Sequence, residues 1–240
     1  MKKINWDNIR VVLIIGVVIF LFSFSSQRNE NRKLTSAKVE FVDNEEFITH
    51  DKVNKLLIQN FNSVGSIRKD KLDLHSVEKR LDSEPMIDKA EVYATVDGKL
   101  IAIIKQKEPI ARVYEGGRSY YLDYKGGEMP LSDNLTARVP IVTGAIESVD
   151  KKQLWKVLKY IYDDDFLKKN IIGIEVRGQD GLKMMVRNYN YSILFGRLQN
   201  VEKKFNNYKA FFQNAVKDTL IENYKTINLK FTQQVVCTKN

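Results

Sequence analysis

The feature that most limits how this chain can fold is an uncharged apolar segment near its start. Residues 11–24 read VVLIIGVVIFLFSF, and through Ser26 the uncharged run has sixteen residues, a little below the ~20 that cross a bilayer as a helix. Ile9 and the interfacial Trp6 lengthen the usable helix, and the side chain of Arg10 can extend toward the lipid headgroups. We therefore expect a transmembrane helix over residues 11–27, after a cytoplasmic head of residues 1–10.

A cleaved signal peptide is the alternative. Its apolar core would span about 7–15 residues and precede small residues, and Ser23-Phe24-Ser25 fits such a cleavage site. The length of the run and the lack of alanine near its end favour an uncleaved anchor. Basic residues nearly balance across the segment, so they do not set its orientation. The short head and the 214 residues after Ser26 favour an N-terminus inside and a body outside the cytoplasm.

Residues 34–108 predict a small module of strands and helices. Residues 36–43 alternate apolar and polar side chains, as a strand with one buried face does. One helix would begin after Thr49, and a second near Asp73, ending before Pro85. Residues 90–96 and 99–107 read as strands joined by Asp97-Gly98, a pair that favours a two-residue type I′ turn. The apolar face of the first helix comprises Val53, Leu56, Leu57 and Phe61.

The stretch EGGRSYYLDYKGGEMPL, residues 115–131, contains four glycines. A phosphate-binding loop needs its glycines between a strand and a helix, but here Pro130 and Pro140 follow in place of a helical pattern. We interpret Gly116-Gly117 and Gly126-Gly127 as turns between strands.

The order of these motifs resembles a known family. The module of residues 34–108 resembles a POTRA domain, with Pro85 and Ala90-Glu91-Val92 at the expected places. Glu108-Pro109-Ile110-Ala111 and Tyr120-Tyr121-Leu122-Asp123 follow it. With the head and the span, this order is similar over nearly the whole chain to the bacterial cell-division family FtsQ, also called DivIB. The resemblance implies an α+β protein with a β-domain at residues 109–240.

The pattern of residues 109–240 agrees with a mixed domain that ends in an exposed strand. A helix begins after Asp150, and strands flank the turn at residues 178–181. A long helix follows, with apolar residues on one face and lysines, including Lys204, largely elsewhere. Strands are expected at residues 191–195, 227–231 and 235–237. Asp163-Asp164-Asp165 reads as a solvated helix end, because adjacent side chains on a helix diverge and cannot converge on a metal. The face of the long helix comprises Leu198, Val201, Phe205, Tyr208, Phe212 and Ala215.

The inventory of chemically active residues predicts a non-catalytic protein without cofactor or metal. The chain has one cysteine, Cys237, and two histidines, His50 and His75, and no Gly-x-Ser-x-Gly motif. Residues 109–240 hold 21 Lys or Arg against 14 Asp or Glu, which we interpret as a solvated surface. Nucleic-acid binding by this half would require it to be cytoplasmic. Neither a nucleic-acid partner nor a small-molecule substrate is expected.

The resemblance implies partners and a binding strand. FtsQ proteins bind the small coiled-coil membrane proteins FtsB and FtsL beside the synthase pair FtsW and FtsI, at the division septum. Their binding strand carries the pattern Asp-Leu-Arg-aromatic near the C-terminus, and this chain has Asn228-Leu229-Lys230-Phe231. Lysine lacks the bidentate fork of arginine, which weakens any ion pair there. The expected contact set is Leu229, Lys230, Phe231, Gln234, Val235 and Val236.

Two alternatives stay open at this point. Val235 and Val236 can instead complete the sheet core, because successive strand residues face opposite sides. As a function, a POTRA-containing periplasmic or secreted module in export or envelope assembly is the alternative to the division scaffold.

Overall fold

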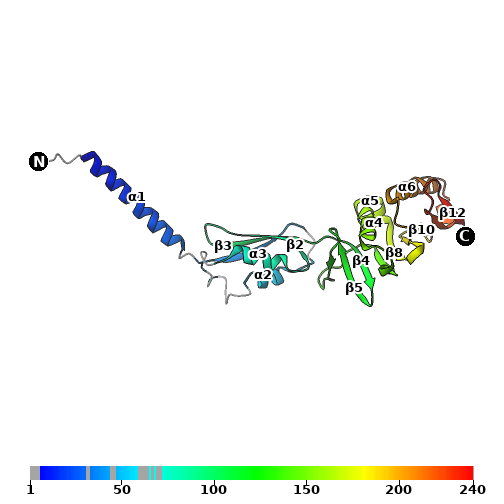
Figure 1. Cartoon of the computed structure of the whole chain (residues 1–240), viewed down its shortest axis with the longest axis horizontal. Coiled ribbons are helices and arrows are strands. Elements are labelled where there is room, and N and C mark those ends of the chain that lie inside the picture. Colours follow the sequence, from blue (N-terminus) through cyan, green and yellow to red (C-terminus); the bar gives the residue numbers. More distant parts are fainter. Residues whose placement is uncertain are drawn as a thin grey trace. The chain divides into compact units, whose positions relative to one another are not determined.

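The computed structural model of the protein describes residues 6–30, 33–43, 47–58, 65, 68 and 72–239. Helix α1, Trp6–Glu30, contains the apolar segment (Figure 1). Within it the 18 residues Arg10–Gln27 have a mean hydropathy of 2.0 and none is buried, so the helix is long and apolar enough to cross a membrane. The chain divides into two compact units, residues 1–106 and 107–240, which we call the proximal unit and the distal unit.

The proximal unit has the predicted strand-helix-helix-strand-strand order. Its sheet has the order β1-β3-β2, with β1 parallel and β2 antiparallel to β3. Helices α2 and α3 pack against this sheet, because each has an apolar face that has to be buried. The elements are β1 (Ser36–Phe41), α2 (His50–Ile58), α3 (Leu74–Asp82), β2 (Ile87–Ala94) and β3 (Lys99–Gln106).

Local side chains fix the starts of both helices. The Thr49 hydroxyl accepts a hydrogen bond from the Lys52 amide at 3.3 Å, and the Asp73 carboxylate accepts one from the Ser76 amide at 3.2 Å. Both residues therefore act as N-caps; this role was predicted for Thr49, whereas for Asp73 only a helix start nearby was expected. Phe61, which we placed on the first helix, lies outside the described residues.

The turn between β2 and β3 differs from the prediction. The Gly98 amide donates to the Thr95 carbonyl at 3.1 Å, and the Thr95 amide donates to the Lys99 carbonyl at 2.8 Å. The loop therefore has three residues, and only Gly98, at φ +86°, is left-handed. An Asp-Gly pair suits a two-residue type I′ turn, but it also suits a type I turn followed by a left-handed glycine. The second form is the one found here.

The distal unit contains a nine-stranded sheet of order β12-β11-β10-β9-β8-β7-β4-β5-β6. Most neighbours are antiparallel, while β4-β7, β7-β8 and β10-β11 are parallel, so the sheet is mixed. The strands are β4 (Pro109–Glu115), β5 (Arg118–Asp123), β6 (Glu128–Met129), β7 (Ile141–Gly144), β8 (Ile171–Val176), β9 (Leu182–Val186), β10 (Ser192–Gly196), β11 (Tyr224–Asn228) and β12 (Val236–Lys239).

Three helices lie together beside this sheet (Figure 1). They are α4 (Lys151–Asp163), α5 (Asp165–Asn170) and α6 (Val201–Lys217), with short 3-10 turns η3 (Ile146–Ser148), η4 (Gly178–Asp180) and η5 (Ile221–Asn223). Their apolar faces share one core with the inward side chains of the strands. In this core the rings of Phe195 and Phe205 lie 4.9 Å apart. The predicted aromatic face of the long helix is therefore core packing.

The glycine-rich stretch forms turns, as predicted. Gly116 and Gly117 have φ of +57° and +77° and form the two-residue turn between β4 and β5. In the next turn, the Asp123 carboxylate accepts hydrogen bonds from the amides of Lys125 and Gly127, at 2.9 and 2.8 Å. No helix follows either glycine pair. The backbone amides of the second turn form their hydrogen bonds within the turn itself.

Candidate protein-binding edge

Strand β12 is the last strand of the distal sheet. It pairs antiparallel with β11, and no strand of the described residues pairs with its outer side. An edge strand directs about half of its backbone N–H and C=O groups away from its sheet. These groups can pair with an extended segment of another chain.

The two faces of β12 differ in burial. Cys237 lies opposite the fully buried Ile227 and, like Val235, packs against the core. Val236 lies opposite Asn228 and is 41% exposed. The sequence left open whether Val235 and Val236 face the core or a partner. In the structure the two side chains face opposite sides: Val235 packs against the core, and Val236 is exposed and available to a partner.

The segment between β11 and β12 corrects the predicted strand over residues 227–231. Strand β11 ends at Asn228, whose side-chain oxygen accepts a hydrogen bond from the Lys230 amide at 2.9 Å and turns the chain. Leu229 is fully buried, so it is a core residue and cannot contact a partner in this conformation. Phe231 follows the turn with 53% of its surface exposed.

This connecting segment is fixed to its neighbours. The Leu229 amide donates to the Leu194 carbonyl at 2.9 Å. The Asn207 side chain on α6 donates to the Thr232 carbonyl at 3.1 Å. Phe231 is thus an exposed aromatic ring on a segment held from both sides, and Gln234 lies exposed before β12.

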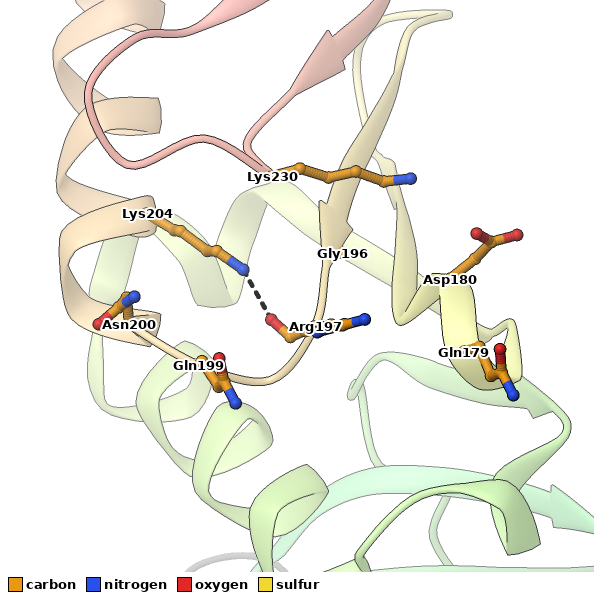
Figure 2. Close-up of a pocket in the computed structure, with 8 residues that line it drawn as sticks. All are labelled: Gln179, Asp180, Gly196, Arg197, Gln199, Asn200, Lys204 and Lys230. Carbon is orange, nitrogen blue, oxygen red and sulfur yellow. Dashed lines mark hydrogen bonds between the residues drawn. The ribbon is translucent and has the colours of Figure 1, made fainter.

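A polar hollow of about 350 Å³ adjoins this segment (Figure 2). Its walls come from η4, from the chain after β10, from the start of α6 and from the chain after β11. Figure 2 shows Arg197 and Lys230 extending toward the side of the hollow where Asp180 lies. The lining residues are Gln179, Asp180, Gly196, Arg197, Gln199, Asn200, Lys204 and Lys230.

Lys204 enters the core, contrary to its predicted place away from the packed face. Only 4% of its surface is exposed. Its Nζ donates to the carbonyls of Phe195 and Arg197, at 2.9 and 2.6 Å, and lies 4.5 Å from the centre of the Phe195 ring. Burial lowers the pKa of the ammonium to about 8, because the low-dielectric interior disfavours its charged form.

The balance of charge suits the hollow to an anionic group. A Cβ added at Gly196 would lie 2.7 Å from Lys230 Cγ, so the lysine stem crosses directly over this glycine. Arg197 and Lys230 bring two exposed cationic side chains to the hollow, against the one carboxylate of Asp180. A carboxylate on a neighbouring chain could therefore form charge-assisted hydrogen bonds here.

The contacts of Cys237 and Asp164 indicate structural roles for these two side chains. Burial raises the pKa of the Cys237 thiol, which is the opposite of the shift that activates a cysteine. Asp164 caps α5 and pairs with Lys209 at 2.7 Å. Across the described residues, no three His, Cys, Asp or Glu side chains gather as a metal site would require.

Comparison with family models places these features in a known context. The model described as FtsQ/DivIB, C-terminal related, matches residues 108–238, more than half of the chain. The chain belongs to the FtsQ/DivIB family. A POTRA-like domain model matches residues 35–105. No curated protein matches the sequence at a significant level.

Both matches coincide with parts of the fold already described. In this FtsQ/DivIB protein, the C-terminal match covers β4 to β11 and most of β12, including Phe231 and the hollow. The POTRA-like match covers the sheet and helices of the proximal unit. Together with the apolar helix α1, family membership indicates single-pass membrane anchoring.

Proposed function

We propose that this protein is a non-catalytic, membrane-anchored scaffold of the bacterial division machinery. Its distal unit would capture an extended segment of a small coiled-coil membrane protein of the FtsB or FtsL type. The observation that carries this proposal is the unpaired outer side of β12 beside the exposed Phe231. Backbone hydrogen bonds of an added strand give affinity, and side-chain contacts next to it give specificity.

The residues near this edge would have different roles in binding the partner. Phe231 would be the anchor, because a large aromatic side chain that becomes buried often dominates an interface. Val236 and Gln234 would contact the partner beside the strand. Lys230 would offer its charge to a partner carboxylate at the hollow. Val235 would support the strand from the core side.

Membership of the FtsQ/DivIB family supports a proposal for the wider role of the protein. With the N-terminus inside the cell and both units outside the cytoplasm, the scaffold would hold its partners beside an FtsW/FtsI-like septal synthase. It would thereby help to recruit or regulate wall synthesis at the septum. The synthase, not this protein, would catalyse the synthesis of the wall.

A pair of matched variants tests the binding edge. Phe231→Ala removes the exposed ring, and Tyr114→Ala removes a ring of similar exposure on β4, 53% against 42%. Binding of the full-length variants to the extracytoplasmic segment of the co-resident FtsB-like protein would be measured by calorimetry. We expect Phe231→Ala to weaken binding by about 30-fold, the effect of a hot spot of ~2 kcal/mol. Tyr114→Ala should leave it unchanged. Equal affinities of the two variants would refute this anchor.

A further inference from the structure

The end of the proximal sheet where the chain arrives from α1 is tied to the β2-β3 turn. The Thr35 amide donates to the Gly98 carbonyl at 2.8 Å, and its hydroxyl donates to the same oxygen at 3.3 Å. A Cβ added at Gly98 would lie 2.9 Å from the Lys33 carbonyl oxygen, so the two segments touch along their backbones. Between them, Leu34 is almost fully buried. These contacts therefore hold the entering segment against the turn.

The topology of the sheet places this turn at the same end as the anchor connection. Strand β1 runs parallel to β3, with Ser36 opposite Lys99. The starts of β1 and β3 consequently lie at one end, and β2 finishes there as well because it is antiparallel to β3. The opposite end of β1 leads to Val42, whose amide donates to the Ile104 carbonyl at 3.0 Å.

The chain between the apolar helix and this end is short. The apolar window ends at Gln27, α1 continues to Glu30, and Lys33 is three residues further on. A helix rises about 1.5 Å per residue and an extended chain at most ~3.6 Å per residue. Lys33 thus lies within about 15 Å of the end of the apolar window. Since the headgroup layer is itself roughly 5–7 Å deep, the tied turn cannot be far from the membrane surface.

The side chains at the turn suit a lipid surface. Val96, at its tip, is 76% exposed. Lys33 and Lys99 lie exposed beside it, and Lys99 pairs with Asp97 at 3.0 Å. Apolar and basic side chains both favour contact with a phospholipid interface, and the two lysines outnumber the one carboxylate of Asp97 at this turn.

We infer that the β2-β3 turn, residues 96–98, contacts the phospholipid headgroups and sets the orientation of the proximal unit on the membrane. This inference rests on the membrane anchor of the proposed function. The turn would be a second point of contact with the membrane, in addition to the transmembrane span. This end of the proximal sheet would therefore face the bilayer.

A fluorescence experiment on the full-length protein tests this contact. Cys237 is first replaced by alanine, and a single cysteine is then introduced by Val96→Cys or by Val42→Cys. Val42 is a matched control because it is also an exposed valine, at 59%, roughly 20 Å away along β1. Each variant is labelled with the fluorophore NBD. It is then placed in nanodiscs of phosphatidylcholine and phosphatidylglycerol that contain a lipid with a nitroxide on its headgroup.

We expect quenching at position 96 to be several-fold stronger than at position 42. Equal quenching at the two positions, weak or strong, would overturn the contact at the turn. Retention of each labelled protein in the nanodiscs is checked by gel filtration before the quenching at the two positions is compared. A chain that is not retained would overturn the anchor, and with it both the contact and the proposed scaffold. A retained chain with equal quenching would overturn the contact alone.

Discussion

Lys204 carries a positive charge into the core of the distal unit, where its hydrogen-bond partners are carbonyl oxygens. These two bonds join the start of α6 to the end of β10, beside the hollow. The arrangement costs stability while the lysine is charged, because neutral carbonyls only partly replace water around an ammonium. We attribute to Lys204 the position of the segment that carries Arg197, one wall of the hollow.

Replacement of Lys204 by methionine should change how stability depends on pH. The folded pKa is about 8, against 10.5 for an ordinary lysine, so between these values the unfolded chain binds more protons. Stability therefore rises with pH across this window, by up to about 3 kcal/mol. The Lys204→Met variant has no such group. We expect the stability of the native protein relative to the variant to increase from pH 8 to pH 10, measured by urea unfolding. A constant difference would contradict the buried charge.

The helical spacing of the sequence indicated that Lys204 is buried, but we did not predict this because the residue is a lysine. Val201, Lys204, Phe205 and Tyr208 follow helical spacing, so Lys204 lies on the packed face by position alone. The prediction placed it elsewhere because lysines are rarely buried. Leu229 shows the same limit, since a pattern cannot tell whether an apolar residue after a strand enters the core or faces a partner.

At the scale of elements, Asp164 separates α4 from α5. Its Oδ1 accepts hydrogen bonds from the Phe166 and Leu167 amides at 3.1 and 2.9 Å, and its Oδ2 pairs with Lys209 on α6. Burial alone would raise the pKa of this carboxyl, but Lys209 and the two amides outweigh it and lower the pKa. The stabilising effect of the charge is present at neutral pH and is lost as pH falls through the folded pKa.

Two neighbouring alanine variants test this cap. Asp164→Ala should lower the free energy of unfolding by about 1–2 kcal/mol, the usual cost of losing an N-cap. Asp163→Ala, at an exposed position next to it, should change it by less than about 0.5 kcal/mol. Thermal unfolding at neutral pH distinguishes them. A smaller effect at position 164 than at position 163 would show that the Asp164 side chain does not stabilise the start of α5.

Long, periodic elements were predictable, and short ones were not. The strand predicted from the alternation of residues 36–43 and the helix predicted after Asp150 are both present, and each buries one face. Strand β7 has only four residues, directly after Pro140, and was missed because it is too short for a period to show. Its parallel pairing with β4 and β8 makes the sheet mixed. Such pairings join strands far apart in sequence, and local patterns do not encode them.

At the scale of the whole molecule, each unit has a core of its own. The distal core draws on all three helices and most strands of residues 107–240. The proximal core is formed by residues such as Val53, Leu81 and Ile104, all fully buried. A unit with its own core can in principle fold alone.

A fragment of residues 107–240 should therefore fold without the rest of the chain. We expect a cooperative thermal transition by circular dichroism and dispersed amide signals by nuclear magnetic resonance. The fragment keeps the pair between Lys107 and Asp123, 3.6 Å apart, at its new start. A fragment without a cooperative transition would show that the distal unit depends on the proximal one.

Hydrogen exchange of the full-length protein, free and bound to the extracytoplasmic segment of its FtsB-like partner, tests strand addition most directly. New backbone hydrogen bonds on the outer side of β12 should slow amide exchange in a peptide covering residues 232–239. Strand β6, at the other edge of the same sheet, provides the internal control and should exchange at the same rate in both samples. Protection that is confined to β6 or to the proximal unit would contradict docking at the C-terminal edge.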